Sequence, residues 1–171
     1  MAYLGNATFA GGLDGWRPIN EAVAVATATG SPAEAPYSGS SFLRFQTSAF
    51  GGSMGIDFDP IDYMAYHLAG DSQAGYFLIS NPIYAKHVDA RIVVRALPGA
   101  GQVSGELTFW ELGLPSGSEN HPRTAFAVGS EWTPVSVSID RIGADLHPWL
   151  RLEIYLTTLN VALDVGLISV T

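Results

Sequence analysis

The amino-acid sequence predicts an all-β protein, built as a sandwich of two antiparallel sheets. Hydrophobic residues recur at every second position in many short runs, which is the pattern of strands with one buried face. Turn-forming residues separate these runs, since the 171 residues include 19 glycines and 10 prolines. Apolar residues at helical spacing are rarely sustained over three turns. Together these observations predict roughly nine to eleven strands, a number typical of a two-sheet sandwich.

The predicted strands follow one another along the whole chain. The run Tyr76–Ile79 is almost continuously apolar, which indicates a central strand. Pro134 cannot donate a backbone hydrogen bond, so its strand is expected to begin at a sheet edge or a bulge. One short segment, Ile61–Leu68, is expected to be helical and to end at Gly70. The other strands are expected at Val23–Thr27, Phe42–Phe45, Met54–Phe58, Arg91–Ala96, Glu106–Trp110, Phe126–Val128, Trp132–Ile139, Leu150–Leu156 and Leu163–Val170.

Two polar loops are longer than ordinary hairpin connections. They span Gly30–Ser41 and Gly113–Thr124, and both are rich in proline and glycine. Loops of this length often carry function, so both are candidate binding loops. No internal repeat and no linker divides the chain, and we expect residues 1–171 to form a single domain.

Composition excludes several functions. The formal net charge is −8, and Lys86 is the only lysine. Nucleic acids and anionic membrane surfaces both require clustered positive charge, so neither is an expected partner. The absence of cysteine excludes disulfides, thiolate metal sites and cysteine nucleophiles. No secretory signal precedes the first motif.

The ionisable residues do not indicate an enzyme. His67, His87, His121 and His147 lack the spacing of a metal-binding pair. His121 and His147 each precede a proline, which predicts solvated turn positions. The carboxylates are mostly isolated on predicted outward faces, whereas glycoside hydrolysis needs two acids that face one groove.

The two ends of the chain carry a family resemblance. Near the start, Asn6, Phe9, Leu13 and Trp16 stand in the run N-A-T-F-A-G-G-L-D-G-W, and the chain closes with L-D-V-G-L-I-S-V. This pattern resembles carbohydrate-binding modules of the xylan- and β-glucan-binding type, which are galactose-binding-like jelly rolls. The resemblance implies a jelly-roll β-sandwich, with Phe9–Trp16 close to the last strand and with Trp16 and Trp132 in the core.

The resemblance also implies a candidate calcium ligand. Related modules often hold a structural ion where the N-terminal segment meets the terminal strand, and Asp164 occupies the matching position. The acid that often follows the phenylalanine is absent, because Ala10 follows Phe9. Calcium takes six or more oxygen ligands, so a weak site or none is the alternative.

A candidate glycan site follows from strand alternation. In the run W-L-R-L-E-I-Y-L the leucines and the isoleucine share one face. Trp149, Arg151, Glu153 and Tyr155 share the other, and Trp110 likewise lies opposite the apolar residues of its strand. Two aromatic rings beside a donor and an acceptor suit a sugar-binding groove. The alternative is that Trp149 and Tyr155 are buried.

These features favour a non-catalytic interaction module. The first hypothesis is a structural or decoration protein that self-associates or docks on a virion or similar assembly, with glycan binding as an added role. Its surroundings would then be an extracellular particle surface. The alternative is a polysaccharide-binding module cut from a secreted glycoside hydrolase. The start at Met1, the single lysine and the high apolar content favour the first hypothesis, and the motifs favour the second.

Overall fold

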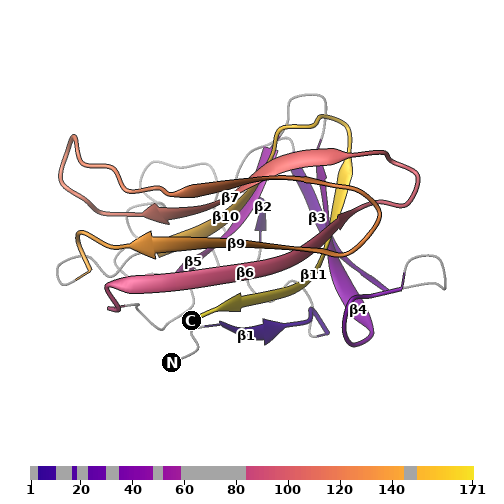
Figure 1. Ribbon diagram of the computed structural model, residues 1–171, viewed down its shortest axis with the longest axis horizontal. Helices are drawn as coiled ribbons and strands as arrows, with labels where there is room; N and C mark the ends of the chain where they lie inside the picture. Colours follow the sequence, from indigo (N-terminus) through magenta and orange to yellow (C-terminus); the bar gives the residue numbers. More distant parts are fainter. Residues whose placement is uncertain are drawn as a thin grey trace.

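Two antiparallel β-sheets pack face to face in the computed structural model (Figure 1). The structure describes residues 4–10, 17–18, 23–29, 35–47, 52–58, 84–144 and 150–171. Every helix or strand in these residues is a β-strand, in agreement with the predicted all-β class. The predicted helix Ile61–Leu68, the predicted strand Tyr76–Ile79 and Trp16 lie outside the described residues.

The first sheet has six strands and carries both ends of the described chain. Its central strand is β11, which pairs with β4 on one side and β6 on the other. The edge strand β9 contains Pro134, so the predicted edge position is confirmed. The order is β3 (Val23–Thr29), β4 (Ser41–Thr47), β11 (Ala162–Val170), β6 (His87–Ala96) and β9 (Thr133–Asp140), with β1 (Leu4–Ala7) paired to β11.

The second sheet has five strands and is centred on β10. Strand β10 pairs with β5 and β7 along its whole length, without a bulge. This regular register matters because it fixes which side chains of neighbouring strands stand side by side. The order is β2 (Arg17–Pro18), β5 (Gly52–Phe58), β10 (Leu150–Leu156), β7 (Val103–Glu111) and β8 (Arg123–Val128).

The core lies between the sheets and follows the alternation seen in the sequence. Leu107 and Phe109 of β7 pack there together with Leu152 and Ile154 of β10, and all four are fully buried. Phe9 from the N-terminal segment joins the same core cluster. The neighbouring residues on the same strands therefore point away from the core.

The start of the described chain and the last strand lie together. Of the segment Phe9–Trp16, which the family resemblance places close to the last strand, residues 11–16 lie outside the described residues. Strand β1 pairs with β11, with Leu4 opposite Val170 and Ala7 opposite Ile168, and the two strands lie side by side in Figure 1. Strand β11 contains a bulge at Gly166. Before the bulge β11 pairs with β4, and beyond it β11 pairs with β1.

The expected core position of Trp132 is wrong. Trp132 is half-buried and lies on the outer face of the six-stranded sheet, where its ring covers the guanidinium of Arg95 at 4.2 Å. Alternation explains this position, because Val135 and Val137 of the following strand point into the core and even-numbered positions point outward. Its indole N–H donates to the carbonyl of Ala35, which attaches the described part of the first long loop to this face.

Among the described residues there is no helix of the length and apolarity needed to cross a membrane.

Candidate functional site

The outer face of the five-stranded sheet gathers polar and aromatic side chains from three adjacent strands. Strand β7 contributes Glu106, Thr108 and Trp110 to this face. The register sets Tyr155 opposite Glu106, and Glu153 opposite Thr108. Each pair lies side by side because directly opposed residues of antiparallel strands have Cβ atoms only about 4.5–5.5 Å apart. Alternation along two strands thus concentrates these groups in one place.

Short and long residues alternate in the row that crosses the middle of this face. On the β8 side Thr108 pairs with Arg123, and on the other side it pairs with Glu153. Beyond Glu153, the register position on β5 is Gly55. The four residues in this row, Gly55, Glu153, Thr108 and Arg123, are therefore alternately short and long. Thr108 lies at the bottom of the gap between its two longer neighbours. This step in side-chain length produces a hollow across the strands.

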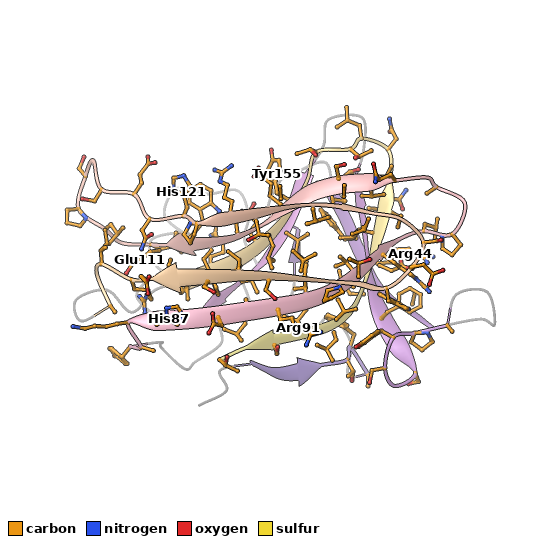
Figure 2. All side chains as sticks on the ribbon, viewed as in Figure 1. Arg44, His87, Arg91, Glu111, His121 and Tyr155 are labelled. Atoms are coloured by element: carbon orange, nitrogen blue, oxygen red, sulfur yellow. The ribbon has the colours of Figure 1, made fainter. Side chains whose placement is uncertain are left out.

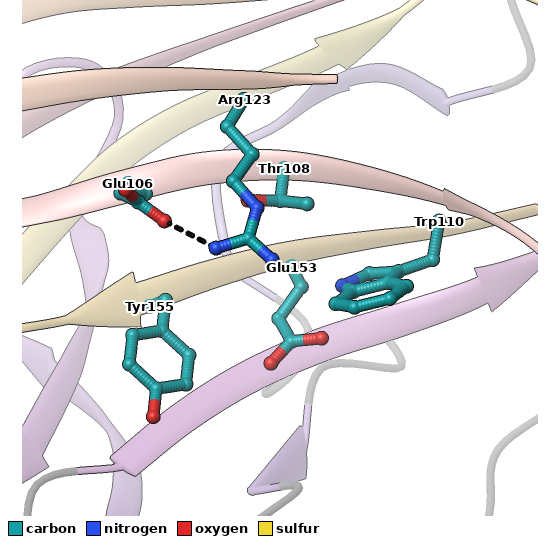
Figure 3. A pocket seen from close by; sticks show the side chains of 6 residues that line it. All are labelled: Glu106, Thr108, Trp110, Arg123, Glu153 and Tyr155. Carbon is teal, nitrogen blue, oxygen red and sulfur yellow. Dashed lines mark hydrogen bonds and ion pairs between the residues drawn. The ribbon is translucent and has the colours of Figure 1, made fainter. Parts of the chain in front are cut away.

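The hollow is a pocket with a volume of about 250 Å³. Tyr155 stands at one end and Trp110 at the other, with Glu153 and Arg123 between them (Figure 3). The volume is slightly below the roughly 300–1,000 Å³ of pockets that enclose drug-sized ligands. It suits one small ring at a time, with the rest of a longer ligand outside. The pocket is lined by Glu106, Thr108, Trp110, Arg123, Glu153 and Tyr155.

An ion pair with Glu106 holds the guanidinium group of Arg123 in the pocket. Nη1 of Arg123 lies 3.0 Å from Oε2 of Glu106, and its guanidinium carbon lies 5.7 Å from the centre of the Trp110 ring. The side chains of Arg123 and Glu106 are 45% and 30% exposed. Both groups therefore remain in contact with solvent while they hold each other in place.

Burial separates the floor of the pocket from its walls. Glu153 is only 6% exposed and Thr108 only 3%, although both face away from the core. Tyr155 is 41% exposed. The pocket thus combines a largely desolvated carboxylate with an open aromatic ring. Carboxylates and guanidinium groups make strong charge-assisted hydrogen bonds to hydroxyl groups, and the ring offers a flat apolar surface.

A histidine covers part of the aromatic wall. The ring of His121 stacks on Trp110, with the ring centres 4.6 Å apart and an angle of 21° between the ring planes. The predicted solvated turn at His121 is therefore wrong, since the His121 side chain is only 27% exposed. Figure 2 places His121 and Tyr155 on one side of the sandwich, with His87 and Arg91 on the other.

The site predicted from the sequence is brought together in part. Trp110, Glu153 and Tyr155 line one pocket, as strand alternation predicts. Arg151 lies on the same face opposite Trp110, half-buried, and is not among the lining residues. Trp149 lies outside the described residues. Sequence reasoning missed Arg123, because it was assigned to the end of a loop rather than to the first position of β8.

Asp164 lies far from this pocket in the fold, on the six-stranded sheet. It is completely buried, and its carboxylate accepts hydrogen bonds from Arg44 at 2.8 and 3.1 Å and from Arg95 at 3.2 Å. Two guanidinium groups supply positive charge and no oxygen ligand, so this environment does not fit a calcium ion. The assignment of calcium to Asp164 stays a prediction that these contacts do not favour. In the described part of the chain no group of three metal-ligating side chains occurs.

Solved structures of carbohydrate-binding modules share this fold. The family-22 xylan-binding domain from Paenibacillus barcinonensis has a TM-score of 0.65 and 15% identity, and the match covers 99% of this chain and 93% of that one. A family-61 module solved with β-1,4-galactotriose has a TM-score of 0.61 and 11% identity, with coverage of 100% and 98%. The jelly-roll fold predicted from the sequence is confirmed.

The same fold also occurs within longer enzymes. A Clostridium thermocellum xylanase fragment, solved with xylohexaose, contains a family-22 module joined to its catalytic module. It has a TM-score of 0.60 and 15% identity, and the match covers 100% of this chain but only 28% of that one. No protein-family model and no curated protein sequence matches the chain. The likeness at these identities establishes the fold.

Proposed function

We propose that this protein is a non-catalytic polysaccharide-binding module, which holds a glycan chain in the pocket on the five-stranded sheet. The observation that carries this proposal is the composition of the pocket. An exposed tyrosine, a tryptophan, two carboxylates and a guanidinium converge on one hollow of the outer face. Structures with the same fold that bind xylan or galactan oligosaccharides add support.

Each group has a distinct part in this proposal. The exposed ring of Tyr155 provides the surface on which the C–H face of a sugar stacks. Glu153 accepts hydrogen bonds from sugar hydroxyls, and its low exposure strengthens them because water competes less. Arg123 donates to ring or hydroxyl oxygens from the opposite wall, while its contact with Glu106 limits its movement. Such a site recognises hydroxyl geometry without any chemical step.

The assembly hypothesis receives no support from these observations. Solved structures that share the fold include carbohydrate-binding modules. Several large hydrophobic side chains are exposed in the described residues, and no observation joins them into one docking surface. They are Tyr37, Tyr84, Ile142, Tyr155 and Leu159. The polysaccharide-binding alternative is therefore the better supported of the two.

Affinity electrophoresis through gels that contain xylan, mixed-linked β-glucan or galactan tests the proposal. We expect at least one polysaccharide to retard the protein. Tyr155→Ala should weaken the affinity about fivefold, since an aromatic contact contributes roughly 1 kcal/mol. Tyr84→Ala is the matched control, because Tyr84 is 60% exposed and precedes β6 of the other sheet.

Two results would contradict the proposal. The first is a wild-type protein that migrates equally in all gels. The second is an equal loss of retardation in Tyr155→Ala and Tyr84→Ala, which would indicate binding elsewhere. Glu153→Gln provides a further check, since an amide keeps the shape of the side chain and removes its charge. We expect this variant to bind more weakly while its far-UV circular dichroism is unchanged.

A further inference from the structure

His121 and Trp110 form a directly opposed pair of an antiparallel ladder. The backbone N–H of Phe109 donates to the carbonyl of Pro122 at 3.1 Å, and that of Glu111 donates to the carbonyl of Asn120 at 2.9 Å. These bonds flank Trp110 on one strand and His121 on the other. They continue the register in which Thr108 pairs with Arg123. The ladder between β7 and β8 therefore continues beyond Arg123, the first residue of β8, as far as His121.

The geometry of this pair brings the two rings close. Between two hydrogen-bonded pairs lies a pair without its own backbone hydrogen bonds, in which the Cα atoms approach to about 4.5 Å. Side chains at such positions are in close contact. The observed separation of 4.6 Å between the ring centres and the angle of 21° are those of a stacked contact. The stack is thus a product of register rather than a chance approach of a loop.

Further contacts hold the backbone around His121 in place. The side-chain amide of Asn120 donates to Oε2 of Glu111 at 2.6 Å and to the carbonyl of Asp140 at 2.9 Å. The carboxylate of Glu111 also accepts hydrogen bonds from the backbone of Ile142 and Gly143 at 3.0 and 2.9 Å. Glu111 has a side chain with no exposed area. The segment before His121 is consequently tied to two neighbouring parts of the fold.

We infer that His121 is a positioning residue of the pocket: it fixes the orientation of the Trp110 ring and covers one of its faces. This inference rests on the proposed function for its effect on binding. With His121 stacked on one face and the Arg123 guanidinium 5.7 Å from the ring centre, Trp110 meets a ligand only through the ring surface that these two side chains leave uncovered. The ring is also ordered before the ligand arrives, so less side-chain entropy is lost on binding. His121 acts through Trp110 and does not line the pocket.

The chemistry of the histidine ring is not needed for this role. Nδ1 of His121 is buried and has no hydrogen-bond partner in the part of the chain that the structure describes. Among the described residues, the acidic oxygen nearest to it is Oε2 of Glu119, which lies 3.8 Å away on a side chain that is 77% exposed. A flat ring without nitrogens should therefore substitute for histidine. This expectation separates a positioning role from a direct hydrogen bond between His121 and the ligand.

Fluorine NMR of protein labelled with 5-fluorotryptophan tests the positioning without any ligand. The chain has 4 tryptophans, and Trp110→Phe identifies the Trp110 resonance by its disappearance. We expect His121→Ala to shift and broaden this resonance, because the ring loses its stacked neighbour. His121→Phe should restore a narrow line. A Trp110 resonance that is unaffected by His121→Ala overturns the inference.

Affinity measurements with the retarding polysaccharide test the consequence for binding. His121→Ala should weaken binding about threefold to tenfold, the range that corresponds to one aromatic contact, and His121→Phe should restore it. In a Trp110→Ala background the same change should have no further effect, since the residue acts through Trp110. An additive loss, or no rescue by phenylalanine, overturns the inference.

The NMR and affinity experiments together separate a failure of the positioning role from a failure of the proposed function. A wild-type protein that binds no polysaccharide, together with a Trp110 resonance that responds to His121→Ala, contradicts the function and upholds the positioning. Binding by the wild type with an unresponsive resonance upholds the function and contradicts the positioning.

Discussion

Replacement of Asp164 by alanine should be among the most destabilising single changes in this protein. Its carboxylate is fully buried and is the shared partner of two guanidinium groups, with Nε of Arg44 at 2.8 Å and Nε of Arg95 at 3.2 Å. The Arg95 side chain is only 6% exposed, so Asp164→Ala leaves a buried positive charge without its partner. Breaking a buried ion pair in this way costs about 3–5 kcal/mol.

The two arginines affect the size of this stability loss in opposite directions. The Arg44 side chain is 25% exposed, so its charge can still be hydrated after the substitution. Arg95 also stacks against the rings of Phe42 and Trp132, at 5.4 and 4.2 Å. These contacts keep Arg95 in place, and they prevent it from reaching water when Asp164 is lost. We therefore expect a loss near 3 kcal/mol.

Urea unfolding followed by circular dichroism measures this loss. Glu106→Ala is the matched control, because it also removes a carboxylate from an Arg–carboxylate contact of similar length, here with partners that are 45% and 30% exposed. Exposed pairs contribute only about 0.2–1 kcal/mol. For a domain of this size 1 kcal/mol shifts the melting temperature by roughly 2–4 °C. Losses that agree within about 1 kcal/mol for the two variants would refute the reasoning, since burial would then have no effect.

The same variants test the calcium assignment. If Asp164 binds calcium, the wild type should be more stable in calcium than in EDTA, and Asp164→Ala should abolish this difference. The arginine contacts predict that the loss caused by Asp164→Ala is the same in both solutions.

Two smaller predictions concern the six-stranded sheet. Gly166→Ala should lower the free energy of unfolding in urea by about 1–3 kcal/mol, because a Cβ at this bulge would lie 2.5 Å from Cβ of Tyr37. Gly129→Ala is the control: its Cβ would meet open space, so the change should be nearly neutral. The hydrogen bond of His87 with Asp140, aided by the charge of Asp89, raises the pKa of His87 above its ordinary value. The stability linked to His87 is therefore fully present below the ordinary histidine pKa of about 6.5 and falls as the pH rises through the raised value. NMR titration should show a lower His87 pKa in Asp140→Asn, and an unchanged pKa would contradict the assignment.

Local alternation accounts for most of what the sequence predicts correctly. The period of two assigns Leu152 and Ile154 to the core, and with them Glu153 and Tyr155 to the outer face. The same rule places Trp110 on the outer face of its own strand. The error at Trp132 has a different origin, because the family resemblance implies a core position there, whereas the alternation of the following strand predicts the outer face.

Strand order and register cannot be predicted from the alternation of apolar residues within single strands. Strands β7 and β10 are separated by β8 and β9 in the sequence, yet they lie side by side in the sheet. A shift of one residue in either register would exchange the faces that meet. The sequence therefore predicts that Glu153 and Trp110 each face outward, but not that Thr108 lies between Glu153 and Arg123.

The pairing of β7 with β8 shows how register creates the candidate site. The segment before Arg123 has the proline, glycine and polar residues of a loop, and Pro122 lacks the N–H that a regular ladder would use. The ladder nevertheless continues past it, because the amides of Phe109 and Glu111 provide the donors. The regular part of the ladder sets Arg123 opposite Thr108, where it reaches Glu106. Its continuation beyond Pro122 sets His121 opposite Trp110. The supporting ring of the pocket therefore depends on backbone hydrogen bonds in a segment whose composition predicts a loop.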